Sequence, residues 1–313
     1  MDKKYDPDEV YRDNEDDEMP IIPSTSGREI VTPTTQTTGE RTPPVRDVKA
    51  GEGAKEDIRN LLSQNKKALD FFDILESDEC IQANLEQANV VAIGRLKYND
   101  HGVTHSRIVT YNVLKILNLL YENGIQPNIM REHGLEFEDA QLICVGGAYL
   151  HDLGNAIHRL YHYQHSMFLA EDFLDSTLKK FYKNLKHRTF VKLMILECLY
   201  AHDESIPCLS LESGCVCVAD GCDMANGRAR VPFSRGKIDI HSISALAIKK
   251  VEIKKGDKKP VRIEVQMSGT AGIFQIQNIL GAKIATSGIK DYIEIVGIAL
   301  DDNEPHPFKQ ILL

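Results

Sequence analysis

The chain has 313 residues, of which 42% are hydrophobic, so it is long enough to bury a substantial core. Its net charge is −9, and residues 1–20, with nine acidic and three basic side chains, contribute −6 of it. This acidic balance argues against a nucleic-acid-binding protein. The hydrophobic runs are shorter than the roughly 20 residues that cross a membrane, and the N-terminus has no apolar signal segment. We therefore expect a cytoplasmic protein without a membrane partner.

Seven cysteines are present, an odd number that favours free thiols over a disulfide framework. Cys215, Cys217 and Cys222 lie close together, but their C-x-C-x4-C spacing matches no common structural zinc pattern. We expect these three residues to be small buried packing residues.

The chain is expected to divide into three parts. Residues 1–52 combine an acidic run with a Ser/Thr/Pro-rich tract, which offers too little apolar surface to offset the entropy of ordering and predicts a disordered tail. Residues 53–238 show helical spacing of apolar residues and predict a mainly α domain. Within it, early helical turns and five longer helices are expected around residues 58–62, 69–75, 105–123, 137–153, 166–180, 188–201 and 210–224.

Residues 239–313 change to a β pattern. Apolar and polar residues alternate along 261–267, which predicts a half-buried strand. A preceding strand over 246–253, an amphipathic helix ending at Gly288 and a last strand over 292–300 complete a small β-β-α-β domain. Because it has no cluster of metal-binding side chains, we expect it to serve regulation or homo-oligomerisation.

Nine of the eleven histidines lie between residues 101 and 202. The sharpest motif among them is Ala-Tyr-Leu-His151-Asp152-Leu-Gly154, which ends an otherwise apolar helix. Such a polar pair is costly to bury unless both groups are bonded, and a divalent cation such as Fe, Mn, Zn or Mg would satisfy both. Adjacent helical side chains point about 100° apart, so the metal must sit at the helix end, with further ligands from other helices.

Candidates for these ligands lie near other predicted helix ends: His105, His165, His202 and Asp220. Two alternatives stay open at the sequence level. His158 and His162 lie on the same stretch as His165, and Asp223 lies one turn after Asp220.

The ordered set His105, His151-Asp152, His165, His202 and Asp220 resembles the HD-domain superfamily of metal-dependent phosphohydrolases, with its minimal pattern H…HD…D. The two additional histidines are similar to the subgroup with a dinuclear centre, and in particular to the HD diadenosine-tetraphosphate hydrolase branch. The resemblance covers residues 95–232. It implies a helical HD bundle in which these six residues hold two metals, bridged by Asp152. It also implies hydrolysis of a phosphate ester or anhydride, in a nucleotide, by a metal-bridging hydroxide.

Other side chains are assigned roles around this centre. Many relatives carry Lys where this chain has Asn155, and Arg159 could replace that lysine in binding phosphate. Arg159 and Arg228 are the preferred phosphate clamps, ahead of Arg107 and Arg230, and Asp203 beside His202 is a candidate proton shuttle. Two alternatives stay open: a di-iron oxygenase on the same scaffold, and a metal-bound nucleotide sensor without turnover.

Overall fold

The computed structural model of the chain describes residues 48–96, 98–224, 240–300 and 310–312. Most of the predicted tail lies outside these residues. However, helix α1 begins at Val48, so the last five residues of that predicted tail are helical. The early turn of α1 is held by an ion pair between Glu52 and Arg107 of α4, 2.5 Å long, a contact that the sequence pattern does not reveal.

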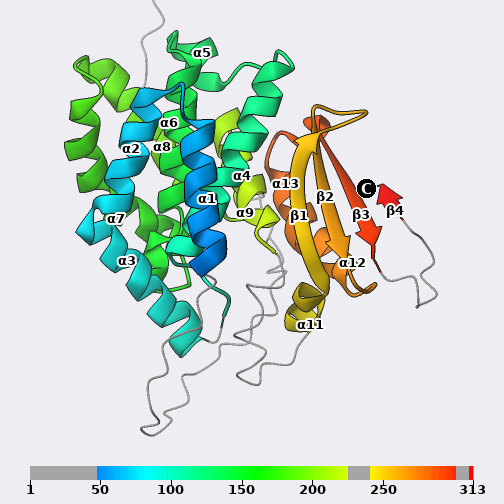
Figure 1. Cartoon of the computed structure of the whole chain (residues 1–313). Coiled ribbons are helices and arrows are strands. Elements are labelled where there is room, and N and C mark those ends of the chain that lie inside the picture. The colour runs from blue at the N-terminus through cyan, green and yellow to red at the C-terminus, as the bar shows by residue number, and fades with distance from the viewer. Residues whose placement is uncertain (1–47, 97, 225–239, 301–309, 313) are drawn as a thin grey trace, which may run out of the picture. The chain divides into compact units, whose positions relative to one another are not determined.

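The N-terminal part is a bundle of helices (Figure 1). Its helices are α1 Val48–Leu61, α2 Lys66–Ser77, α3 Glu79–Asn89, α4 Val103–Glu122, α5 Asn128–His133, α6 Phe137–Leu150, α7 His162–Thr177, α8 Leu185–Ala201 and α9 Leu211–Cys222, with the short segments η2 Val90–Arg95, η3 Leu153–Ala156 and η4 Leu178–Lys180. The mainly α prediction is confirmed; α3 and α5 were not predicted, because α3 is largely polar and α5 is short. No helix among the described residues is long and apolar enough to cross a membrane.

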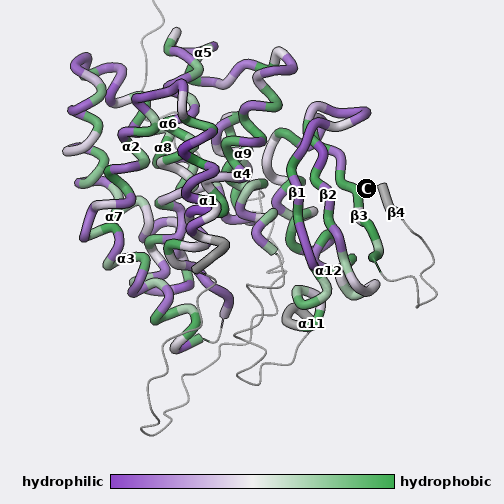
Figure 2. The backbone as a smooth tube through the Cα atoms, viewed as in Figure 1, coloured by the Kyte–Doolittle hydropathy of each residue, from purple (hydrophilic) through white to green (hydrophobic). Residues whose placement is uncertain are grey.

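Helix α6 is the buried centre of this bundle. All its residues from Asp139 to Leu150 are buried, and it contacts α2, α4, α8 and α9. The mainly apolar sequence of α6 accounts for this burial, and Figure 2 colours the chain by the hydropathy of each residue. A capping box between Glu136 and Asp139 fixes where the helix begins. Because the apolar run continues to Leu150, the helix carries the next two residues, His151 and Asp152, into the protein interior.

The C-terminal part contains a four-stranded sheet in the order β1-β2-β3-β4. Its elements are α11 Ile240–Ala247, β1 Ile248–Lys255, β2 Val261–Met267, α12 Gly272–Gln275, η5 Ile276–Leu280, α13 Gly281–Thr286, η6 Lys290–Tyr292, β3 Ile293–Ala299 and β4 Gln310–Leu312. Strands β1 and β2 form an antiparallel hairpin, and β3 pairs parallel to β2 with Val261 opposite Ile293. The predicted β-β-α-β order is therefore correct, and the three-residue β4 adds to it.

The helical segment after β2 packs directly on α9. A Cβ atom on Gly214 would lie 2.2 Å from the carbonyl oxygen of Ser287, so only glycine allows this approach. The backbone N–H of Cys208 donates to the carbonyl of Thr286 at 2.9 Å. The predicted domain boundary near residue 238 lies outside the described residues, but all the described ones belong to one compact unit. The α/β part thus touches the helix that carries Asp220.

Candidate metal centre

The turn after α6 is clamped to the start of α7. Ser166 accepts a hydrogen bond from the N–H of Gly154 at 2.8 Å and donates to the carbonyl of His151 at 2.5 Å. A Cβ atom on Gly154 would lie 1.9 Å from the carbonyl oxygen of His162. Glycine at position 154 therefore brings the first turn of α7 against the His-Asp pair.

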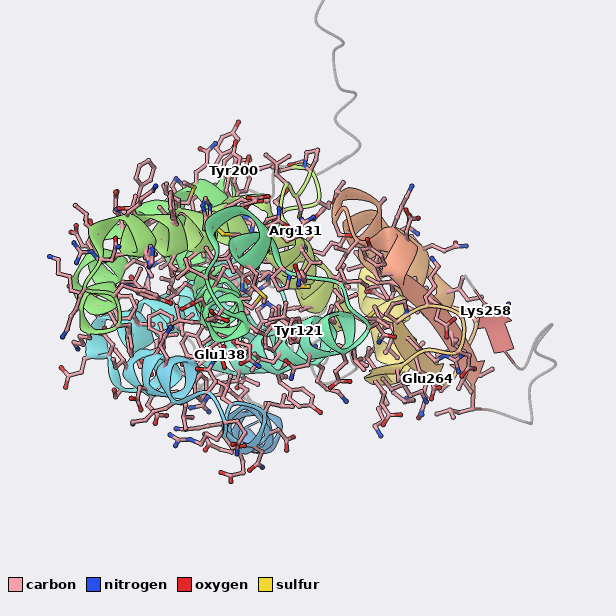
Figure 3. All side chains as sticks on the ribbon, turned by 90° about the horizontal axis from the view of Figure 1, so that it is seen from above. Tyr121, Arg131, Glu138, Tyr200, Lys258 and Glu264 are labelled. Atoms are coloured by element: carbon pink, nitrogen blue, oxygen red, sulfur yellow. The ribbon has the colours of Figure 1, made fainter. Side chains whose placement is uncertain are left out.

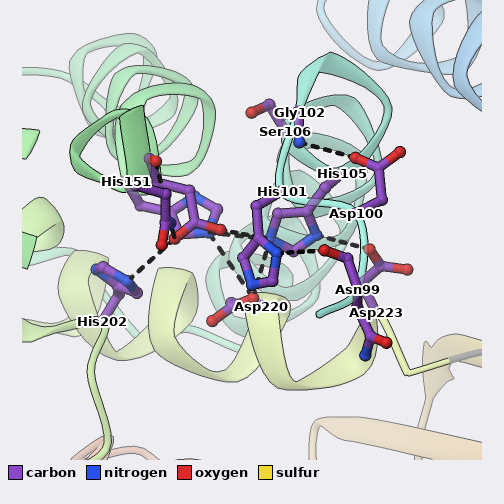
Figure 4. A network of polar contacts seen from close by, with 12 residues as sticks. Asn99, Asp100, His101, Gly102, His105, Ser106, His151, His202, Asp220 and Asp223 are labelled. Carbon is purple, nitrogen blue, oxygen red and sulfur yellow. Dashed lines mark hydrogen bonds and ion pairs between the residues drawn. The ribbon is translucent and has the colours of Figure 1, made fainter. Parts of the chain in front are cut away.

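Four side chains from three segments form a first group of candidate ligands (Figure 4). Nε2 of His105, in the first turn of α4, lies 3.1 Å from Nε2 of His151. The Oδ2 atom of Asp152 lies 3.3 Å from each of these nitrogens. The Oδ1 atom of Asp220, in the last turn of α9, lies 3.2 Å from the first nitrogen and 3.7 Å from the second.

These separations fit a shared metal ion. Two ligand atoms that each lie about 2.1 Å from one metal are roughly 3.0 Å apart at a right angle and roughly 3.4 Å apart at a tetrahedral angle. The five separations given above run from 3.1 to 3.7 Å. The imidazole and carboxylate donors also suit Fe, Mn or Zn. The first group could therefore hold one divalent ion.

The histidines of the centre are fixed through their other ring nitrogen. Nδ1 of His151 lies 2.8 Å from the carbonyl of Ala148, and Nδ1 of His202 lies 2.7 Å from the carbonyl of Leu199. Both carbonyls can only accept, so each Nδ1 carries a proton, which leaves Nε2 as the ring nitrogen that can bind a metal. Nδ1 of His105 lies 2.6 Å from the carboxylate of Asp223. Such outer partners orient metal-binding histidines in known metalloproteins.

A second group of three ligand atoms lies on the other side of Asp152. Nε2 of His162 is 3.0 Å from Nε2 of His202, the C-cap residue directly after α8. The Oδ1 atom of Asp152 lies 3.4 Å from the first of these nitrogens and 3.8 Å from the second. The two oxygens of Asp152 thus face different groups, the arrangement required of a carboxylate that bridges two ions.

The protonation states also suit metal binding. Burial alone would raise the pKa of Asp152, but His151 and other neighbouring histidines lower it well below the ordinary value. Burial acts likewise on Asp220, and Lys283 reverses the effect, so the pKa of Asp220 is also strongly lowered. Burial lowers the pKa of His162, and it lowers the pKa of His202 to about 4. Ionised carboxylates and neutral imidazoles are the forms that bind metals.

Comparison with known proteins places the chain beside an archaeal relative. It is 45% identical over 243 residues to the uncharacterized protein MJ1020 of Methanocaldococcus jannaschii, a match covering 78% of this chain and 93% of that protein. The chain belongs to the same family as this archaeal protein. No protein-family model matches the chain, and no solved structure matches it.

Two histidines at the start of α7 were candidates for the second group, and the structure places them differently. The structure brings His162, not His165, beside His202 and Asp152. The buried residues of α7 form one stripe: His162, Ser166, Ala170, Leu174 and Thr177. His165 lies off this stripe, and its buried Nδ1 has no hydrogen-bond partner among the described residues. The sequence places His162 and Ser166 one helical turn apart, a signal that could have found the ligand.

Two neighbours of the first group have roles that the sequence left open or missed. Asp223, the alternative to Asp220, contacts Nδ1 of His105, the ring nitrogen that points away from the other candidate ligands, and so orients the ring. His101 was not predicted to belong to the centre, but it is buried, and its ring lies 5.8 Å from the ring of His105 (Figure 4).

The predicted phosphate-binding arginines have different outcomes. Arg159 lies at the centre, because its Nη1 is 3.8 Å from Oδ1 of Asp152 and donates to Oδ1 of Asn155 at 3.1 Å. Arg107 instead forms a two-pronged ion pair with the buried carboxylate of Glu76 and is committed to the fold. Arg228 and Arg230 lie outside the described residues.

The predicted proton shuttle, Asp203, caps its own turn. Its Oδ1 accepts hydrogen bonds from the backbone and the hydroxyl of Ser205, at 3.1 and 2.6 Å. Burial alone would raise the pKa of Asp203, but these bonds lower it below the ordinary value. A carboxylate held in its ionised form is a weak base, and a shuttle role for Asp203 stays a prediction.

A row of tyrosines borders the second ligand group. The ring of Tyr163 lies 5.8 Å from that of His162, 6.3 Å from that of Tyr161 and 5.5 Å from that of Tyr200. Tyr161 is exposed and has a φ of 59°, which is uncommon for a residue with a side chain and marks a constrained position. Tyr200 lies at the outer surface of α8 (Figure 3). Aromatic surface thus lies next to the candidate ligands.

Proposed function

We propose that this protein is a metal-dependent hydrolase of phosphate ester or anhydride bonds. The observation that supports it is that the two carboxylate oxygens of Asp152 face different histidines: Oδ2 faces His105 and His151, and Oδ1 faces His162 and His202. Two ligand groups that share a carboxylate suit a pair of divalent ions. Such a pair activates water and neutralises the oxygens of a phosphoryl group.

The side chains around the centre supply binding and orientation. Arg159 is held by Asn155 near Asp152, and its guanidinium can pair with phosphate oxygens in a two-pronged manner. Asn155 also donates to Oδ1 of Asp152 at 2.7 Å, which fixes the carboxylate between the two groups. The guanidinium group of Arg159 takes the place of the lysine that many HD-domain proteins have shortly after the His-Asp pair. It gives the phosphate a positively charged partner.

The substrate we propose is a nucleotide. Beside Arg159, the chain exposes Ile157, Leu160 and Tyr161, and the tyrosine row continues from there. A nucleotide offers both a phosphate for the arginine and a base that can stack on an aromatic ring, an interaction worth about 1–3 kcal/mol. The side chain of Arg159 next to an aromatic surface therefore favours a nucleotide as substrate over a small inorganic phosphate compound.

The test measures phosphate release from a panel of nucleoside monophosphates, nucleoside diphosphates and dinucleoside polyphosphates. The assays contain Mn²⁺ or Fe²⁺ and are run both aerobically and anaerobically. We expect metal-dependent release that is abolished in Asp152→Asn and retained in Asp172→Asn, a matched variant at an exposed position of α7. Metal-dependent nucleotide binding without turnover would refute hydrolysis and favour a sensor. Turnover that requires O₂ would refute it in favour of a di-iron oxygenase.

A further inference from the structure

Lys283 of α13 reaches the centre from the C-terminal part of the chain. Its Nζ lies 2.7 Å from Oδ2 of Asp220 and donates to the carbonyl of His202 at 2.6 Å. Its side chain is only 10% exposed. The other carboxylate oxygen of Asp220, Oδ1, faces His105 and His151. A lysine distant in sequence thus forms an ion pair with one of the two carboxylate oxygens of a candidate metal ligand.

The burial of this ammonium group calls for a strong partner. Removing a charged amine from water costs several kcal/mol unless an opposite charge and hydrogen bonds compensate. Asp220 supplies the charge and His202 supplies a carbonyl, and they come from different ligand groups. Glu204 contributes little, since its Oε2 is 3.9 Å away and the residue is exposed. Lys283 therefore ties α9 to the end of α8 at the centre itself.

The packing around Lys283 makes this contact a built feature. A Cβ atom on Gly221, the residue after Asp220, would lie 3.2 Å from Cδ of Lys283, so the lysine stem runs along α9. The Sγ atom of Cys217, one turn earlier on α9, lies 3.6 Å from the carbonyl of Lys283. Both the backbone of α13 at Lys283 and the aliphatic part of the lysine side chain thus pack against α9. This packing holds the ammonium group beside Asp220.

We propose that Lys283 is a positioning residue that keeps Asp220 a one-oxygen metal ligand. Because Oδ2 is occupied by the ammonium group, only Oδ1 is free for an ion in the first group, and one coordination position stays open for water or substrate. Without Lys283, both oxygens of Asp220 can turn to the ion and close that position. The C-terminal α/β part, expected from the sequence to serve regulation or homo-oligomerisation, thereby completes the metal centre. This inference rests on the proposed function, since it requires that the first group bind a metal.

The experiment uses the full-length chain loaded with Co²⁺, whose visible absorption is stronger with four or five ligands than with six. The variant is Lys283→Met, and Lys254→Met is the matched control, since Lys254 pairs with Glu264 on the hairpin. We expect wild type and control to bind two Co²⁺ with the same spectrum. Lys283→Met should still bind Co²⁺ but absorb more weakly, and its kcat should fall about 10–100-fold with KM nearly unchanged, the range known for outer partners of metal ligands.

A folded Lys283→Met protein with the wild-type Co²⁺ spectrum and wild-type kcat would overturn the inference. If that variant does not fold, Lys283→Ala decides instead: it removes the donor to Oδ2 of Asp220 with less apolar bulk, and the same two results are read. Wild-type protein that binds no Co²⁺ would refute the proposed function itself. Wild-type protein that binds two ions, with unchanged Lys283 variants, would refute only the role of Lys283.

Discussion

Replacing His162 separates the two ligand groups. The second group has three ligand atoms, from His162, His202 and Asp152, so His162→Ala leaves two. Catalytic sites usually hold a metal through three protein ligands, and two are too few for stable binding. The first group keeps its four ligand atoms, which do not include His162. We therefore expect the metal-to-protein ratio to fall from two to one.

The matched control is His165→Ala. This change removes an imidazole from the same helix, but one whose buried Nδ1 has no partner among the described residues, so the ratio should stay at two. Both proteins are purified anaerobically, loaded with excess Mn²⁺, desalted and measured by elemental analysis. Thermal unfolding of the metal-free forms is recorded alongside, so that loss of a metal is distinguished from loss of the fold.

The opposite pattern would refute this reasoning. If His165→Ala lowered the metal-to-protein ratio to one and His162→Ala left it at two, the ligand of the second group would be His165, as the sequence pattern suggested, and not His162. A ratio of two in both variants would show that neither histidine is needed, and the second group would then not be a metal site.

Three further predictions follow from named contacts. Asp223→Ala should weaken metal binding by the first group about 10–100-fold, measured by competition with a chelator, because His105 loses the partner of its Nδ1; equal affinity would exclude this orienting role. Tyr161→Ala should raise KM for a nucleotide but not for inorganic tripolyphosphate, which has no ring, and an equal change for both substrates would argue against base stacking. Glu76→Gln should lower the free energy of unfolding by about 3 kcal/mol at pH 7, measured with urea, because Arg107 loses its buried partner and keeps only the exposed Glu52. Burial alone would raise the pKa of Glu76, but Arg107 and other partners lower it, so its stabilisation is present above the ordinary value of 4.5 and is lost as the pH falls through the lowered pKa; a difference from wild type that persists in acid would contradict this.

The His-Asp pair could be predicted because its signal is local. A long apolar helix that ends in two polar residues must place them at the edge of the core, and the structure has His151 and Asp152 there, both buried. The strand over Val261–Met267 could be predicted for a similar reason, since the alternation of apolar residues is contained in the segment itself. Local periodicity therefore established most of the fold and the first half of the centre.

The choice between His162 and His165 could not be made from local pattern alone. The predicted helix began at residue 166, whereas α7 begins at His162, and helix starts are poorly defined without a capping residue. What fixes the start is a tertiary contact: the backbone N–H of Gly154 bonds to Ser166 twelve positions away. The register of α7 against the metal centre is thus set by packing.

The role of Lys283 shows a second limit, because it depends on how separate segments pack. Nothing near Lys283 in the sequence suggests a metal centre, and its helix reads as the ordinary amphipathic cover of a sheet. Only the approach of α13 to α9, which requires glycine at position 214 to pass Ser287, brings the ammonium group to Asp220. The domain boundary predicted near residue 238 falls between Asp220 and Lys283, which form one ion pair. A truncation near residue 238 would consequently leave the carboxylate of Asp220, whose side chain is only 12% exposed, without its cation, and its effect on metal binding would report on the centre directly.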